Sequence, residues 1–162
     1  MLRRLAPATV SPPVDAAALV MRVIIGPIMA YHGWKLVQGG VGNFARFVAG
    51  NVHVPAPELV GRAVVVIELA GGVFLVLGLL TRLWALALAA LMISIVFLVK
   101  WDLGLIGPPG QGGGYELDLA IAACALGVLF IGPGRFSLDH LLAREQTAGG
   151  GAKATSRSAA ST

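Results

Sequence analysis

The stretch from Gly61 to Arg82 constrains the fold of this chain more than any other. Between Arg62 and Arg82 the one ionisable side chain is Glu68, and the other residues there are apolar or small. At about 1.5 Å per residue, a helix of this length matches the bilayer core of roughly 30 Å. We therefore expect a membrane span with one carboxyl group near its centre. Because an acidic group at that depth costs roughly 3 kcal/mol to insert, Glu68 should face a partner or a wet cavity.

The composition excludes a soluble domain. Hydrophobic residues make up 57% of the 162 residues and charged residues 12%, with a mean hydropathy of +0.83, so there is too little polar surface to cover a soluble core. The net charge of +4 comes from basic residues at the ends of apolar runs, which indicates membrane topology rather than nucleic-acid binding. The single cysteine, Cys124, allows no disulfide within the chain and no CxxC pair, so any redox chemistry must come from outside it.

We predict an all-α fold, an integral membrane antiparallel four-helix bundle with spans at about 16–37, 60–80, 83–100 and 115–132. Residues 1–145 form this domain and include a short amphipathic C-terminal helix, and residues 146–162 are expected to be a disordered tail. Seven Lys and Arg residues fall on one side of this topology and four on the other. The positive-inside rule then predicts that both termini are cytoplasmic in a bacterial plasma membrane.

The first predicted span carries three ionisable side chains. Arg22 lies on the face that should meet other helices, with a long side chain able to extend toward Glu68 or down to lipid phosphates. His32 suits proton exchange near neutral pH, with ordinary anchoring as an equal alternative. Lys35 lies beside Trp34, a pattern that favours a side chain reaching to the membrane interface.

Acidic residues also open the last predicted span. Glu116 and Asp118 suit the positive end of a helix dipole, and because they are two residues apart, at most one should face the bundle. Counting along the spans places His32 and Asp118 about 6 to 8 Å below the outer surface and Glu68 roughly 5 Å deeper. The candidate polar pocket therefore comprises His32, Glu68, Asp118, Glu116, Arg22 and Lys35. The alternative is an interhelical ion pair that only fixes the bundle.

Glycines mark the surfaces where we expect helices to pack closely. These positions are Gly26, Gly33, Gly61, Gly71 and Gly72. No histidine or cysteine pair has the spacing of metal ligands, so the sequence predicts no metal site.

Over about residues 17–141 the sequence resembles the DoxX family of bacterial four-helix membrane proteins. The resemblance rests on RVIIGPIMAYHGWKL in the first span, on ELAGGVFLVLGLLTR in the second, and on YELDLA followed by GPGRFSLD. It implies an inner-membrane protein associated with redox processes. Relatives include the small membrane subunit of a thiosulfate:quinone oxidoreductase, and an actinobacterial member looks like a partner of superoxide dismutase and a sulfurtransferase. The family pattern carries over to Arg22, Gly26, His32, Gly33, Lys35, Glu68, Gly71, Gly72, Gly78, Arg82, Glu116 and Asp139, without any catalytic assignment.

The leading hypothesis is a membrane subunit or docking partner of a quinone-, thiol- or oxidative-stress-linked redox system. A quinone is the candidate cofactor, held among His32, Glu68 and Asp118. The expected partners are the lipid bilayer and a soluble or membrane redox enzyme, and a homo-oligomer is left open. The alternatives are a small solute or proton transporter and a non-catalytic membrane scaffold.

Overall fold

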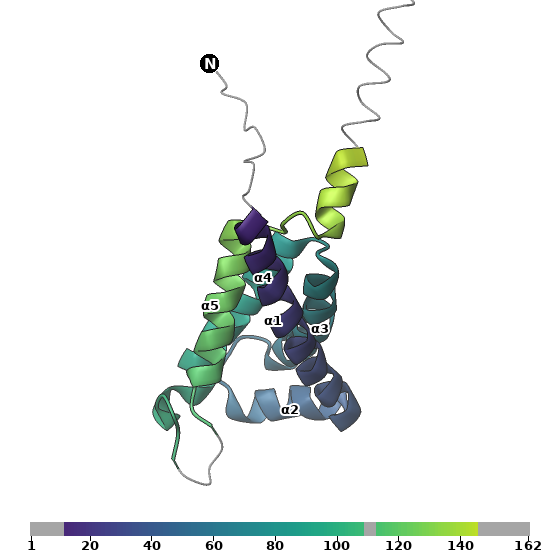
Figure 1. Cartoon of the computed structure of the whole chain (residues 1–162). Coiled ribbons are helices and arrows are strands. Elements are labelled where there is room, and N and C mark those ends of the chain that lie inside the picture. The colour runs from purple at the N-terminus through teal and green to yellow at the C-terminus, as the bar shows by residue number, and fades with distance from the viewer. Residues whose placement is uncertain (1–11, 109–112, 146–162) are drawn as a thin grey trace, which may run out of the picture.

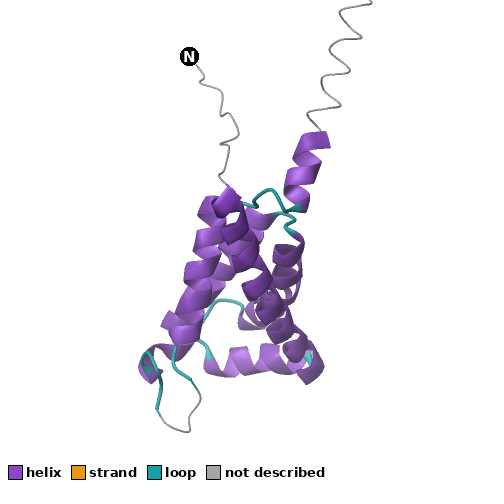
Figure 2. Ribbon diagram, viewed as in Figure 1, coloured by secondary structure: helices purple, strands orange, loops and turns teal. Residues whose placement is uncertain are grey.

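Helices account for every regular element of the computed structural model, which describes residues 12–108 and 113–145 (Figure 2). They are α1 (Pro12–Gly39), α2 (Val41–Asn51), α3 (Pro57–Leu77), α4 (Thr81–Ile95) and α5 (Glu116–Ile131), with a further short helix over residues 138–145. After α4 the chain continues through a π-helical turn (Val96–Lys100) and a 3₁₀ turn (Trp101–Leu103). The all-α prediction is confirmed. The tail predicted over residues 146–162 lies outside the described residues.

Helices α1, α3, α4 and α5 run along one bundle and alternate in direction, as Figure 1 shows. The beginning of α1 and the helix over residues 138–145 lie at one end, and α2 lies across the opposite end. Three helical stretches are long and apolar enough to cross a membrane: Pro12–Gly39, Pro57–Leu77 and Thr81–Leu103. The fourth bundle helix, α5, has 16 residues, which at about 1.5 Å each is shorter than the bilayer core.

The ends of α3 follow from its sequence. Pro57 occupies the first turn, where a missing backbone N–H removes no hydrogen bond. At the other end Gly78 has a φ of 70°, in the left-handed region that glycine adopts easily, and its N–H donates to the Leu75 carbonyl at 3.1 Å. The chain can therefore turn at once into α4.

Close packing joins α1 to α3. A Cβ atom added to Gly26 would lie 2.6 Å from Cγ2 of Val76 and 2.8 Å from the Gly72 carbonyl oxygen, so neither glycine leaves room for a side chain. Gly33 meets the Leu69 backbone in the same way. Small residues of this kind let membrane helices approach with their backbones nearly in contact. The first and third helices are therefore held as one tight pair.

A second pair is formed by α4 and α5. Small and branched apolar side chains fill its core, among them Ala85, Leu88, Ala89, Ile121, Ala125 and Val128. At the end of the bundle that α2 crosses, the two pairs do not close on each other. Helix α2 buries Ala45 and Val48 there, and Gly61 of α3 admits Ala45, since a Cβ at Gly61 would lie 2.7 Å from Cα of Ala45.

Candidate functional site

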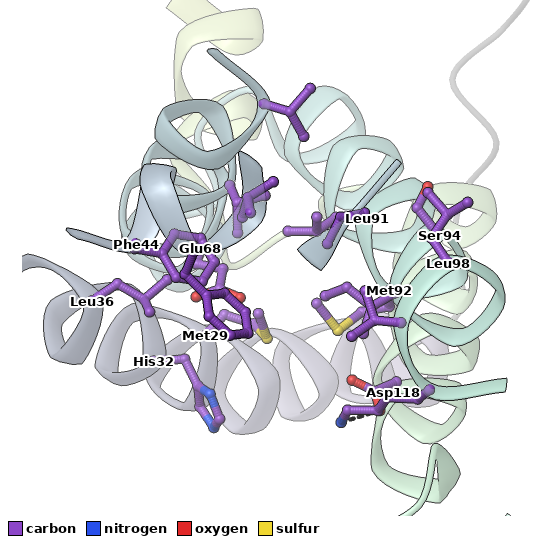
Figure 3. A pocket seen from close by; sticks show the side chains of 18 of the residues that line it. Met29, His32, Leu36, Phe44, Glu68, Leu91, Met92, Ser94, Leu98 and Asp118 are labelled. Carbon is purple, nitrogen blue, oxygen red and sulfur yellow. Dashed lines mark hydrogen bonds and ion pairs between the residues drawn. The ribbon is translucent and has the colours of Figure 1, made fainter. Parts of the chain in front are cut away.

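A cavity of about 370 Å³ lies between the two helix pairs, at the end of the bundle that α2 crosses. Its lining comes from every main helix, with Met29 from α1, Phe44 from α2, Glu68 from α3, Met92 from α4 and Asp118 from α5 (Figure 3). Most of the lining side chains are apolar. Small-molecule sites in proteins span about 300–1,000 Å³ and have mainly apolar walls with a few polar groups, so the cavity has the size and character of a ligand site.

Glu68 supplies an unpartnered polar group to this cavity. The residue is 7% exposed and lies on the buried face of α3, one turn from Val65 and one turn from Gly72. Its Oε2 atom is buried and has no hydrogen-bond partner among the described residues. A buried carboxyl oxygen without a hydrogen-bond partner costs free energy, so a ligand that forms a hydrogen bond with this carboxyl group would recover it.

Asp118 is paired with Lys100, which lies in the π-helical turn after α4. Nζ of Lys100 lies 2.6 Å from Oδ2 of Asp118, and both residues line the cavity. Lys100 belongs to the π-helical turn, and π turns are often found at functional sites. Glu116, two residues before Asp118, is exposed and does not line the cavity. One of the two carboxylates therefore faces the bundle, as their spacing predicted.

His32 and Lys35 lie at the rim of the cavity. Both residues are exposed, and in Figure 3 the His32 ring points away from the Glu68 carboxyl group. Nζ of Lys35 lies 5.7 Å from the centre of the Tyr31 ring, a cation–π contact on its own helix. The structure thus brings four of the six candidate residues to one cavity, although His32 makes no contact with the Glu68 carboxyl group.

Arg22 lies away from the cavity and donates to four backbone carbonyls. Nε donates to Leu75 at 2.8 Å, Nη2 to Val76 at 3.1 Å, and Nη1 to Pro133 at 2.6 Å and Phe136 at 3.1 Å. Two of these acceptors belong to the last turn of α3, where helix carbonyls lack the usual partner four residues on and carry partial negative charge. The side chain therefore reaches neither of its expected targets, Glu68 or the lipid phosphates.

Asp139 makes hydrogen bonds at the same end of the bundle as Arg22. Its carboxylate accepts from the backbone N–H groups of Leu80 (2.8 Å) and Thr81 (2.9 Å), where α4 begins, and its own N–H donates to the Gly78 carbonyl. An anion at a helix N-terminus and a cation at a helix C-terminus both interact favourably with the helix dipole. Arg22, Gly78 and Asp139, three residues of the family pattern, therefore connect the helices at the end opposite the cavity.

The sequence did not lead us to predict that Lys100 lines the cavity, or that α2 covers one side of it. A signal for the lysine was present, since Lys100 ends one apolar run and Asp118 begins the next. Two opposite charges at facing ends of successive antiparallel helices are placed to meet. Among the described residues, no group of three or more His, Cys, Asp or Glu side chains could hold a metal ion.

Comparison with known proteins gives one family and two relatives. The model of the DoxX family matches residues 17–101. The uncharacterized membrane protein Rv3486 of Mycobacterium tuberculosis is 29% identical over 145 residues, which cover 83% of this chain and 86% of the relative. A Bacillus subtilis protein named "Putative oxidoreductase CatD" is 31% identical over 93 residues, 57% of this chain and 66% of the relative. No solved structure matches the chain.

Proposed function

The chain belongs to the DoxX family of membrane proteins, and from this premise we propose that it is a membrane subunit or docking partner of a redox system that binds a quinone-type headgroup in the cavity beside Glu68. The single observation that carries the proposal is the buried Oε2 atom of Glu68, which lacks a hydrogen-bond partner among the described residues and lies on a ligand-sized apolar cavity.

The lining residues fit such a headgroup. A quinone ring is flat and apolar, with oxygen atoms at its edge, and it needs apolar walls together with a few polar contacts. Met29 and Met92 supply flexible, polarisable walls that favour contact with a ring, and Phe44 of α2 adds an aromatic face. Glu68 supplies the polar contact. When bound, the quinone would supply two-electron redox chemistry, which this chain needs from outside because it has one cysteine.

Within that complex the residues of this chain have separate roles. The Glu68 carboxyl group donates its O–H to a headgroup oxygen and exchanges that proton with it, since a carboxyl group within hydrogen-bond reach can act as acid or base. Helix α2 excludes water from one side of the cavity with Phe44 and Val48.

The name of one relative supports a redox role without naming a substrate. The Bacillus subtilis relative carries a provisional oxidoreductase name, and the Mycobacterium tuberculosis relative is described as a membrane protein. The proposed location is the bacterial inner membrane, with both termini of the chain on the cytoplasmic side. That side carries more Lys and Arg residues than the opposite side. On that side the exposed Phe136, Leu141 and Leu142 form a surface suited to a partner enzyme.

Binding of a short-chain quinone to the protein in lipid nanodiscs tests the proposal. We expect saturable binding to the wild type and about tenfold weaker binding to Glu68→Gln, because the carboxyl O–H that donates to a quinone oxygen is replaced by a weaker amide donor. Glu58→Gln is the matched control, since Glu58 is an exposed carboxylate on the same helix. Equal affinity of the wild type and Glu68→Gln, or no binding to the wild type, would remove the site.

A further inference from the structure

The polar groups of the cavity lining differ in whether their hydrogen-bonding capacity is already used. The Ser94 hydroxyl donates to the Ala90 carbonyl at 2.7 Å, and the Lys35 ammonium lies over the Tyr31 ring. The His32 ring points away from Glu68 (Figure 3). The Ser94 hydroxyl is thus occupied and His32 and Lys35 are exposed at the rim, so the less exposed polar groups that can meet a ligand are Glu68 and the ion pair of Lys100 and Asp118.

Within the ion pair, the lysine has capacity to spare. An ammonium group has three donors, and Lys100 uses one of them on Asp118. The Lys100 side chain is 30% exposed and that of Asp118 is 10% exposed, so the cation is the more accessible partner. The Asp118 carboxylate thus holds the Lys100 ammonium group in place, and the other N–H donors of Lys100 can meet a ligand.

The backbone around Lys100 favours this placement. The π-helical turn at Val96–Lys100 buries Val96 and ends at Lys100, after which Gly104, with a φ of 74°, turns the chain away. Ring stacking of Phe97 on Trp101 and of Trp101 on Tyr115 ties this turn to the residue before α5, with centroid distances of 5.2 and 6.0 Å. Lys100 is therefore fixed between two helices at the edge of the cavity.

We propose that Lys100 is the headgroup-selecting residue of the cavity: its ammonium group, positioned by Asp118 and the π-helical turn, donates to an accepting oxygen of a membrane-soluble ligand whose apolar part lies along Met29 and Met92. This inference rests on the proposed function. It adds the substrate class, an amphipathic lipid-phase molecule with a carbonyl, phenolic or other accepting oxygen. A charged donor makes a hydrogen bond roughly twice as strong as a neutral donor does, so Lys100 favours oxygen-bearing headgroups over purely apolar molecules.

Binding measurements on single-charge variants test the proposal. The probe is a decyl-substituted benzoquinone, titrated into the full chain in nanodiscs. Lys100→Met keeps the length of the side chain and removes its charge, and we expect about tenfold weaker binding. Arg62→Met is the matched control because it removes a cation from an exposed ion pair that does not line the cavity, and we expect less than about a twofold change. Equal affinity of Lys100→Met and the wild type, or equal losses in both variants, would overturn the proposal.

A charge-reversed pair separates ligand binding from structural support. Lys100→Asp combined with Asp118→Lys restores an ion pair between the same helices but moves the cation to α5. If Lys100 contacts the ligand, this double variant stays folded and still binds at least about fivefold more weakly than the wild type. Full recovery of binding would show that the pair only supports the fold and would refute the proposal.

The two proposals fail in different ways. Loss of binding in Glu68→Gln with unchanged binding in Lys100→Met would leave the proposed function and remove the role of Lys100. Absence of quinone binding to the wild type would remove the proposed function. A fatty acid of the same chain length is then the second probe for Lys100, because its carboxylate also offers an accepting oxygen, and failure of the wild type to bind it would refute the proposal as well.

Discussion

Replacement of Arg22 by methionine should destabilise the bundle more than any other single loss of charge in the described part of the chain. The guanidinium group donates four hydrogen bonds to backbone carbonyls of α3 and of the segment after α5. The Leu75 oxygen keeps the Gly78 N–H as a donor, whereas the carbonyls of Val76, Pro133 and Phe136 lose the donor that Arg22 supplies.

The size of the effect follows from those three carbonyls. An unsatisfied buried polar group costs about 1–3 kcal/mol, and interhelical hydrogen bonds in membrane proteins are worth about 0.6–1.7 kcal/mol each, so we expect Arg22→Met to lower the free energy of unfolding by about 3–5 kcal/mol. Arg22→Lys keeps the charge but cannot span both segments with a planar fork, so its loss should lie between the wild type and Arg22→Met.

Equilibrium unfolding in mixed micelles with increasing SDS measures these free energies, with Trp84 fluorescence as the signal because Trp84 stacks on Phe74 in the bundle. Arg62→Met is the matched control, since Arg62 is exposed and makes one surface ion pair with Glu58. Its unfolding free energy should change by less than about 1 kcal/mol. A value for Arg22→Met within the same limit would refute the reasoning about the four carbonyls.

Three further predictions concern packing, capping and topology. Gly72→Leu should separate α1 from α3 and prevent stable folding, whereas Gly50→Ala, with open space around it, should unfold like the wild type in the same SDS titration. Asp139→Ala should lose about 0.5–2 kcal/mol because it removes the acceptor of the first N–H groups of α4, and an unchanged unfolding midpoint would contradict the capping role. Topology can be tested by cysteine labelling in spheroplasts, after the native Cys124 has been replaced. Glu58→Cys should react with a membrane-impermeant maleimide in intact spheroplasts, whereas Arg144→Cys should react only after lysis. The reverse pattern would contradict the proposed topology.

The sequence allowed the helices to be predicted because hydropathy and charge spacing act locally. The apolar run around Glu68 identified α3, and the short spacing of Glu116 and Asp118 indicated that at most one of them faces the bundle. The close approach of α1 and α3 at Gly26 and Gly72 also follows from local composition, since only small residues permit it.

The partners of the charged side chains could not be predicted in the same way. Arg22 binds carbonyl oxygens that lie 53 to 114 residues away, and backbone acceptors leave no mark in the sequence. The meeting of Lys100 with Asp118 depends on a π-helical turn, which no feature of the apolar run indicates. The direction of the His32 ring is a choice of rotamer, which spacing along a helix does not determine.

The central claim is that a ligand makes a hydrogen bond to the Glu68 carboxyl group inside the cavity. Infrared difference spectroscopy of the full chain in nanodiscs, recorded with and without the decyl-substituted benzoquinone, reports directly on that group. We predict a shift of a carboxyl stretching band in the wild type that is absent in Glu68→Gln and retained in Glu58→Gln. A quinone-induced band that persists in Glu68→Gln, or no band in the wild type, would contradict the account.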